Sequence, residues 1–331
     1  MEQIINNLLP VLAPKIILPG ADEGISTSRA FIEANTVECG LEELKNTHCI
    51  PVWLKDNEPL ISHADFIETT GRIVSDIFHG EQILRPNIRV SHPIKGRIPS
   101  AKDKPAHLLL DEERTIQYER MMFVVEVPSI QAEVGGNMLS LIIGGIKSYS
   151  EDNLYQRSGG DQHFKLFIGF QNRVCTNLCV WSSGVNASLT VKGIEQLYLA
   201  ISSLVKLYNS GHHLFHLRKL AEHSITESEF AHIIGRIRMY NYLPNHLRTG
   251  IQEMLLTDTQ IGMVVRDYYR DDSFCRQVDG RINLWRLFNL FTGANKSSYI
   301  DSFLTRSVNA YDFTEQIRWA LEGRTGSWYL E

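Results

Sequence analysis

The sequence predicts an α+β fold: a central antiparallel sheet, N-terminal helices that flank it, and a helical C-terminal half that packs on it. Apolar residues alternate with polar ones, with a period of two, in several stretches between residues 120 and 191. From Gly193 onward the apolar period becomes helical. Strands and helices thus occupy separate blocks, which favours α+β over the alternating order of a parallel βαβ sheet.

The composition is that of a folded globular protein, with 43% hydrophobic and 21% charged residues over 331 positions. This length suits one large domain or two ordinary ones. We expect a boundary near residue 192, between residues 1–192 and 193–331, with no linker, so that both regions form one continuous globular unit. The formal net charge of −5 restricts any nucleic-acid site to a local patch.

The sequence favours a cytoplasmic protein that is not associated with a membrane. The N-terminus has no basic n-region and is interrupted by Pro10 and Pro14, unlike a signal peptide. No apolar run approaches the roughly 18 residues of a transmembrane helix. The five cysteines are an odd number and do not resemble a disulfide framework. The pattern carries no signal for an oligomeric state.

The N-terminal region predicts mainly helices. Ser62 and Asp65 resemble a capping box, and apolar residues follow at helical spacing until Gly80. The expected elements are a short helix and a loop within residues 1–25, helices from about Ser28 and over 41–46, a strand over 49–54 that enters a turn at 56–59, and a helix over 63–78.

The middle of the chain predicts strands and the last third predicts helices. Gly135 and Gly136 mark a hairpin turn, and Thr226 with Glu229 forms a capping box. We expect strands over 120–127, 138–146, 163–181 with a bend at 171–172, and 185–191, and a polar loop over 149–162. Helices are expected from residue 193 and over 226–237, 258–269, 282–291, 299–306 and 313–321.

A basic segment precedes the strands. Residues 85–104 carry six basic residues and one acidic residue, with Pro86, Pro93 and Pro99 spaced through them, which predicts a loop or an edge segment. It is a candidate phosphate-binding arm. The alternative is a solvated loop whose basic residues balance the charge of the acidic residues just downstream. The candidate phosphate ligands are Lys95, Arg97, Lys102 and Lys104.

The strand from residue 163 has two different faces. Its even positions are apolar and predict a core face, whereas its odd positions are mostly polar, with Phe167 and Trp181 among them. The second face is a candidate nucleic-acid platform on which these rings stack. Alternatively it is covered by a helix or simply solvated. The candidate ligands on this face are Lys165, Gln171, Arg173 and Asn177.

Three groupings suggest metal or phosphate chemistry and favour ordinary explanations. Cys175 and Cys179 lie about 13 Å apart on an extended strand, too far for one zinc ion unless the chain turns sharply at residues 176–177. His212, His213, His216 and His223 lack a carboxylate at ligand spacing. Residues 292–298 lack the glycine that a phosphate loop has before its lysine, so Gly293 is expected to cap one helix and Ser297 the next. We therefore expect no metal site, no cofactor and no catalytic motif.

Five segments together resemble a bacterial family catalogued as domain of unknown function number 3871, carried by gut bacteria and their mobile elements. The resemblance runs from about residue 51 to the C-terminus. A weaker similarity links RVCTNLCV to phage- and plasmid-like proteins. The resemblance implies a mobile-element context and no catalytic residues. The segments are SHPIKGRIP (91–99), YERMMF (118–123), FIGFQNRVCTNLCV (167–180), GRIRMY (235–240) and NLFTGANKSSYIDSFL (289–304).

Three functions are compatible with these patterns. The first is a non-enzymatic accessory protein of a mobile element that binds nucleic acid, single-stranded DNA in particular, through the basic arm and the polar strand face. The second is a protein-interaction module that modulates a host system through its helical half. The third is an enzyme of unrecognised class built from Arg173, Asn177 and the histidines.

Overall fold

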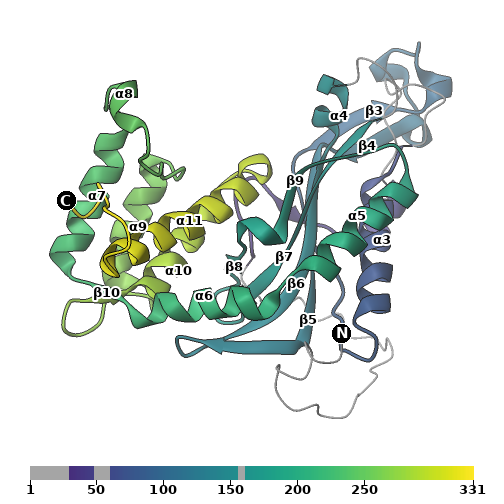
Figure 1. Ribbon diagram of the computed structural model, residues 1–331. Helices are drawn as coiled ribbons and strands as arrows, with labels where there is room; N and C mark the ends of the chain where they lie inside the picture. Colours follow the sequence, from purple (N-terminus) through teal and green to yellow (C-terminus); the bar gives the residue numbers. More distant parts are fainter. Residues whose placement is uncertain (1–29, 48–59, 156–160) are drawn as a thin grey trace.

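The computed structural model describes residues 30–47, 60–155 and 161–331, and it confirms the α+β architecture (Figure 1). The main sheet is antiparallel, with strand order β1-β2-β5-β6-β7-β8, and β9 also pairs with β7. None of the described helices is long and apolar enough to cross a membrane. The strands are β1 (Val37–Glu38), β2 (Asn87–Val90), β5 (Arg120–Val134), β6 (Asn137–Ser148), β7 (Gln162–Asn172), β8 (Leu178–Cys179) and β9 (Val185–Val191).

The β5–β6 hairpin is the centre of the sheet and is longer than predicted. Its turn is made by Gly135 and Gly136, whose φ angles of 55° and 80° lie in the left-handed region that glycine enters without strain. A register shift between Val127 and Gln131 accommodates Pro128 inside β5. Because proline cannot donate a hydrogen bond to the next strand, it is tolerated at such a bulge.

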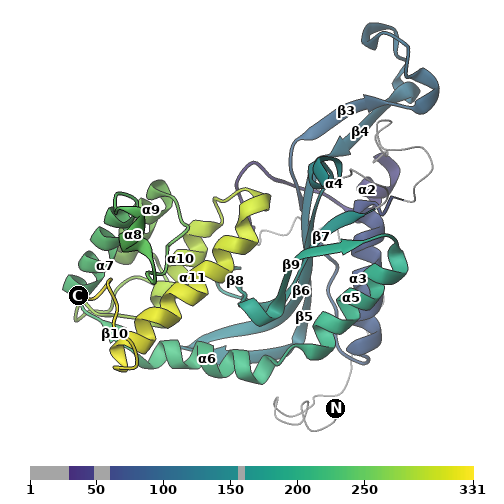
Figure 2. The same ribbon diagram turned by 45° about the horizontal axis from the view of Figure 1, so that its top comes forward.

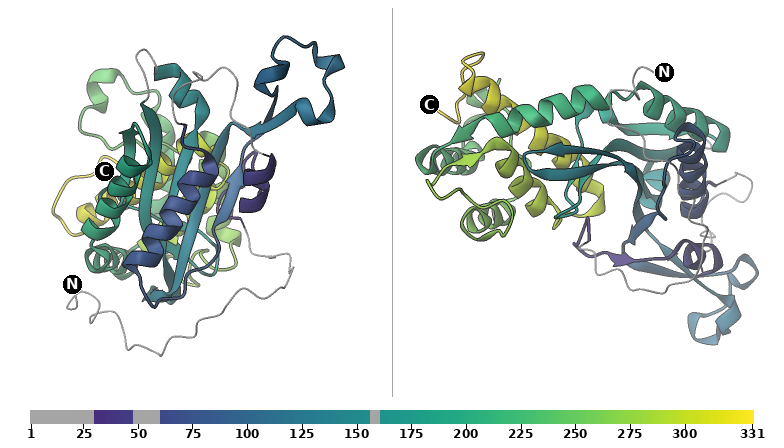
Figure 3. Two further views of the ribbon diagram at one scale, coloured as in Figure 1. Left: turned by 90° about the vertical axis from the view of Figure 1, so that its right-hand side faces the viewer. Right: turned by 90° about the horizontal axis from the view of Figure 1, so that it is seen from below.

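One face of the sheet is covered by α3 (His63–Ile77) and α5 (Ile194–Leu207), which lie side by side in the left view of Figure 3. The predicted capping box at Ser62 is present and α3 ends just before Gly80, as expected. Phe66 projects from α3 onto the sheet, with its ring 5.0 Å from that of Phe123 and 4.9 Å from that of Phe164. This is the core face expected from the even positions of β7.

The opposite face is also covered, so the open platform predicted for β7 is wrong. Phe31, Ile300, Phe303 and Leu304 form a second apolar cluster on this face, and Phe167 is buried among them. The helix that supplies three of these residues, α11 (Ile300–Leu321), meets the sheet with its N-terminal end in Figure 1. The alternative in which a helix covers this face is therefore correct.

The C-terminal helices pack against the sheet and against each other, and α6 runs along the lower edge of the molecule in Figure 2. The helices expected from residue 193 and over 226–237, 258–269 and 282–291 are all present. The division near residue 192 stays a prediction. These elements are α6 (Ser210–Glu222), α7 (Glu227–Tyr240), α8 (Asn245–Arg248), α9 (Asp258–Arg270), α10 (Leu284–Asn295), α11, and the short pair β10 (Ser224–Ile225) and β11 (Ile282–Asn283).

The two helices predicted over 299–306 and 313–321 are a single helix. Two polar residues between them, Ser307 and Asn309, make tertiary hydrogen bonds and do not interrupt α11. Ser307 accepts a hydrogen bond from the Asn295 amide at 2.9 Å. Asn309 donates to the carbonyl of Glu253 and accepts from the backbone N–H of Leu255, both at 2.7 Å.

Other sequence expectations have mixed outcomes. The helix over 41–46 is confirmed as α2 (Leu41–Thr47), and the strand over 185–191 as β9. No helix is present over residues 30–36, which form bends and turns, with Asn35 at a φ of 47°. The expected polar loop over 149–162 contains α4 (Tyr149–Tyr155). The elements predicted within residues 1–25 and 49–59 lie outside the described residues.

Candidate nucleic-acid interface

A two-stranded ribbon projects from one end of the main sheet and stands clear of the molecule in Figures 2 and 3. It consists of β3 (Pro93–Arg97) and β4 (Arg114–Tyr118). Its tip contains three short 3-10 turns, η1 (Pro99–Ala101), η2 (Ala106–Leu108) and η3 (Asp111–Glu113). We call residues 93–118 the arm. The predicted loop or edge segment therefore contains strands β2 and β3, and Pro93 occupies the first position of β3, where no donor is needed.

The strand register places three cations on one face of the arm. Lys95 is paired with Ile116, and Arg97 with Arg114. Directly opposite residues of an antiparallel pair point to the same side, so these four side chains share a face. The alternate positions Thr115 and Gln117 are buried. Sequence reasoning missed Arg114, which follows three acidic residues, because only the register of the hairpin reveals that it opposes Arg97.

The tip of the arm uses some of its charges internally. The ammonium of Lys104 lies 2.6 Å from the carboxylate of Glu113, and the guanidinium of Arg97 donates to the Lys104 carbonyl. The Lys104 hydrogen bond holds the pKa of Glu113 below its usual range, aided by the Leu110 backbone N–H. The alternative, in which basic residues of this segment pair with the acidic residues downstream, is therefore correct for Lys104.

The other cations of the arm stay accessible. Lys95 and Lys102 are exposed and have no ion-pair partner in the described chain. The guanidinium of Arg114 lies 3.3 Å from the carboxylate of Asp111, but the Asp111 side chain is 95% exposed. An ion pair in contact with this much water contributes little stability, so a phosphate group can compete with Asp111 for Arg114.

Apolar side chains are exposed beside these cations. Leu108 is 55% exposed, Leu110 is 53% exposed and Ile116 is 41% exposed. Large apolar residues exposed in a group commonly mark a contact surface. The arm therefore combines accessible positive charge with apolar side chains that project into solvent.

The four candidate ligands on β7 and after it do not join the arm. Lys165 is mostly buried, and its ammonium lies 2.8 Å from Glu151. Gln171 is partly buried and lies six residues further along β7, a distance of about 20 Å for a strand. Arg173 is exposed beyond the end of β7, with one guanidinium nitrogen 3.4 Å from the Gln131 side-chain oxygen. The predicted eight-residue interface is therefore divided.

Asn177 has a structural role. It is buried, and its amide donates to the backbone carbonyl of Asn289 at 2.9 Å. Asn172 donates to the side chain of Asn289 at 3.2 Å. Nearby, the ammonium of Lys296 donates to the Cys175 carbonyl and, at 2.8 Å, to the hydroxyl of Thr176. The segments RVCTNLCV and NLFTGANKSS thus meet and fix the end of β7 to α10.

Trp181 is also unavailable for base stacking. It is buried, and its ring is stacked on His213, with centroids 4.9 Å apart and planes 3° apart. The hydroxyl of Tyr208 lies 2.6 Å from His213 Nδ1. Burial lowers the pKa of His213 to about 3, so this imidazole is neutral at ordinary pH.

The buried pair Lys147 and Asp152, at the base of the arm, resembles a catalytic site in only one respect. Burial lowers the pKa of Lys147, which is a common property of catalytic lysines. However, neither side chain has exposed surface, and neither lines the three pockets that lie around Leu60, Val185 and Arg276. A substrate cannot reach either group, so the pair is structural.

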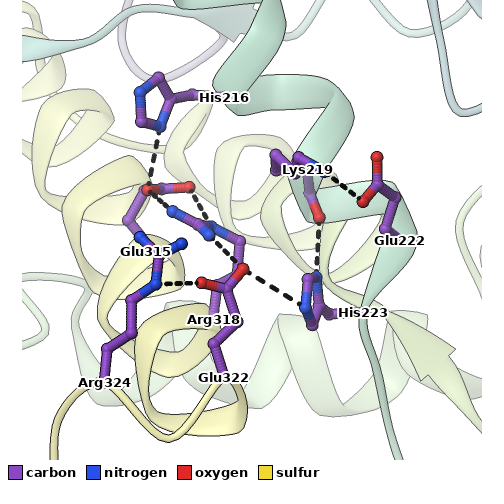
Figure 4. A network of polar contacts seen from close by, with 8 residues as sticks. All are labelled: His216, Lys219, Glu222, His223, Glu315, Arg318, Glu322 and Arg324. Carbon is purple, nitrogen blue, oxygen red and sulfur yellow. Dashed lines mark hydrogen bonds and ion pairs between the residues drawn. The ribbon is translucent and has the colours of Figure 1, made fainter.

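His216 and His223 belong to a polar network that joins α6 to α11 (Figure 4). His216 Nδ1 lies 3.3 Å from a carboxylate oxygen of Glu315, which Arg318 approaches to 2.7 Å. Arg318 also contacts Glu322, and Glu322 lies 3.4 Å from His223. Within the described residues, no group of three or more histidine, cysteine or acidic side chains has the geometry of a metal site.

The remaining groupings are structural as well. Thr176, with a φ of 59°, makes the sharp turn after β7, but Cys175 and Cys179 are both buried. Burial raises the pKa of Cys179 and makes its thiolate inaccessible. The predicted caps Gly293 and Ser297 are wrong in position, because α10 continues to a cap at Lys296 and α11 begins at a cap at Tyr299.

Comparison with known families places these features in context. The family model described as "Domain of unknown function, B. Theta Gene description (DUF3871)" matches residues 14–330. Neither the curated proteins nor the solved structures contain a match to the chain.

Proposed function

Because the chain belongs to this family of unknown function, we propose a function from its own geometry: the arm binds nucleic acid through its basic face, without catalysis. The observation that carries the proposal is the pairing of Arg97 with Arg114, next to Lys95. Like charges directly opposite each other on a ribbon destabilise it. An anion bound between them converts this repulsion into attraction.

The chemistry of the arm suits a phosphate backbone. Guanidinium groups bind phosphate oxygens through pairs of hydrogen bonds, and lysine adds a point charge. The basic face of the ribbon supplies Lys95, Arg97 and Arg114, and Lys102 adds a fourth cation at the tip. The net charge of −5 opposes non-specific binding elsewhere on the molecule, so this local patch determines where a polyanion binds.

The exposed apolar residues indicate how bases are contacted. β-ribbon arms carry cations to the grooves of nucleic acids, and apolar side chains such as leucine or isoleucine insert between base steps. Leu108, Leu110 and Ile116 occupy such positions beside the cations. The arm has no exposed aromatic residue apart from His107, so insertion of aliphatic side chains, and not aromatic stacking, accompanies the phosphate contacts.

The expected salt dependence follows from the number of cations. Each neutralised phosphate contributes about −0.9 to the slope of log K against log salt for duplex DNA, and about −0.7 for single strands. Four contacts therefore give a slope of about −3.6 for duplex and about −2.8 for single-stranded DNA.

Fluorescence anisotropy with labelled single-stranded and duplex DNA over a series of salt concentrations tests the proposal. The informative variant is Lys95→Gln, Lys102→Gln, Arg114→Gln, which leaves Arg97 in place because that residue supports the tip. For this variant, the slope of log K against log salt for duplex DNA should be shallower by about 2.7, and its affinity at low salt should be much lower than that of the wild type.

The matched control removes the same charge elsewhere. Lys192, Lys206 and Arg270 are exposed, lie outside the arm and have no ion-pair partner among described residues. Their triple change to glutamine should leave the slope unchanged. Absence of binding at low salt, or equal loss in both triple variants, refutes the proposal.

DNA binding by the arm would suit a cytoplasmic protein of a mobile element, which is the context expected from the sequence. Burial shifts the pKa values of Lys147, Cys179 and His213, yet all three lie in the protein interior and line none of the described pockets, which favours binding over catalysis. A host protein bound at the helical half remains the alternative partner, and the changes in the arm would then leave its binding unaffected.

A further inference from the structure

A second surface, outside the arm, has the features of a peptide-binding site. It begins with β9, an edge strand of the main sheet, which pairs with β7 on one side only. Apart from the N–H of Val185, which donates to the carbonyl of Ser182, the residues of β9 form no other backbone hydrogen bond in the described chain. Ala187, Ser188 and Thr190 are exposed. The outer edge of β9 therefore presents unpaired backbone donors and acceptors, which is the requirement for adding a further strand.

The edge adjoins an apolar groove of about 420 Å³. Val185 and Ala187 form one wall from β9, and Leu304 and Val308 form the other wall from α11. Val185 is paired with Phe167, so its side chain points to the same side of the sheet as the second apolar cluster. A strand added beside β9 would direct every second side chain into this groove.

The groove contains one acidic residue that no described residue neutralises. Asp312 of α11 lines it, and the described structure provides no hydrogen bond or ion pair to its carboxylate. Partial burial, with a contribution from Glu315, raises the pKa of Asp312. The carboxylates of α11 elsewhere are paired: Asp301 with Arg120, and Glu315 with Arg318. Asp312 therefore lacks a cation that its neighbours on the same helix possess.

We propose that the β9 edge and this groove bind an extended peptide of a partner protein, with alternating apolar residues and one lysine or arginine that pairs with Asp312. Backbone hydrogen bonds to β9 supply sequence-independent affinity. Leu304 and Val308 select apolar side chains, and Asp312 selects the cation. This surface is separate from the arm, so its occupancy does not depend on nucleic-acid binding.

Selection of random eight-residue peptides displayed on phage, against the full-length protein and against Asp312→Lys, tests the proposal. Peptides enriched on the wild type should carry alternating apolar residues and a lysine or arginine. On Asp312→Lys the favoured charge should reverse to aspartate or glutamate. Asp312→Asn should keep the apolar preference and lose the charge preference, which separates a specificity change from a folding defect.

Synthetic versions of the enriched peptides test the strand pairing. N-methylation of alternate backbone amides removes donors to β9, and in one of the two registers it should weaken binding at least about tenfold, a loss of one or more hydrogen bonds. Val308→Asp, inside the groove, should abolish binding. The matched control for Asp312→Lys is Asp272→Lys, which makes the same charge reversal at an exposed position just after α9. This position is outside the groove, so the change should not affect peptide binding.

Three results would overturn the proposal: no enrichment over an unrelated protein, the same charge preference on wild type and Asp312→Lys, or equal binding of peptides methylated in either register. Each can be obtained with the full chain, and none requires a known partner.

Discussion

The ammonium of Lys147 lies 2.7 Å from the carboxylate of Asp152, and neither side chain has any exposed surface. The second oxygen of Asp152 accepts a hydrogen bond from the backbone N–H of His163 at 2.7 Å. The Lys147 ammonium also lies 4.1 Å from the ring centre of Phe164. This single buried pair therefore connects β6, α4 and β7 where the arm leaves the sheet.

Asp152→Asn should destabilise the protein by about 3–5 kcal/mol, because it leaves the Lys147 charge buried without a counter-ion. Urea unfolding at neutral pH measures the loss. The double variant Lys147→Met, Asp152→Asn should recover a large part of it, since the uncompensated charge is then removed. As a control, Glu68→Gln breaks a surface pair with Lys45 and should cost about 1 kcal/mol or less. A similar small cost for Asp152→Asn contradicts the interpretation.

Gly145→Ala should destabilise the sheet through overpacking. A Cβ atom at this position would lie 2.2 Å from the ring of Phe66, which is held between Phe123 and Phe164. Insertion of a methyl group into a packed core costs about 1–3 kcal/mol. Thermal or urea unfolding measures this cost.

The second change Phe66→Leu distinguishes a steric cause from a general loss of strand propensity. Leucine is smaller than phenylalanine and makes space for the added methyl group. Phe66→Leu alone should destabilise, yet Gly145→Ala should cost less in that background than in the wild type. Strictly additive costs would show that the two residues do not interact.

His213 should make stability depend on pH on the acid side. Its pKa is about 3 in the folded protein, because of burial, against an ordinary value of 6.5. Between these pH values, His213 therefore binds a proton in the unfolded chain but not in the folded protein. The contribution of His213 to the free energy of unfolding is fully present above about pH 6.5. It decreases as the pH falls toward 3, by at most about 1.4 kcal/mol per pH unit.

Urea unfolding of wild type and His213→Phe at several pH values from 7.5 to 4.5 isolates this contribution. The variant loses the contact with the Tyr208 hydroxyl and should be less stable at neutral pH. Its stability should nevertheless decrease less steeply toward low pH than that of the wild type. Parallel pH curves for the two proteins would rule out a neutral buried His213.

Local signals in the sequence predicted the elements of this fold well. Capping boxes at Ser62 and Thr226 and the glycine pair in the β5–β6 turn act within a few residues, and the structure contains all three. The break expected in α11 was wrong because Asn309 is satisfied by the segment containing Glu253 and Leu255, more than fifty residues away. Such long-range hydrogen bonds leave no local pattern.

The candidate site was only partly predictable for the same reason. Alternation correctly separated the two faces of β7, but it does not reveal that α11 covers the polar one. The basic run before the sheet was visible, whereas Arg114 was hidden behind three acidic residues. Its membership of the basic face depends on the register that joins Arg97 to Arg114. Cross-strand neighbours separated by a long tip cannot be identified by counting residues.

The opposition of Arg97 and Arg114 predicts that a small multivalent anion stabilises the arm. At low ionic strength the two guanidinium groups repel each other across the ribbon, and a pyrophosphate ion bound between them should remove that penalty. Hydrogen–deuterium exchange of the amides of β3 and β4 should therefore slow when millimolar pyrophosphate is added, while exchange in α3 stays unchanged. In Arg114→Thr, which keeps a residue suited to a strand but removes one charge, pyrophosphate should have little effect on the arm. Equal protection of the arm in wild type and variant would mean that the anion acts elsewhere, and no protection in either would remove the arm as an anion site.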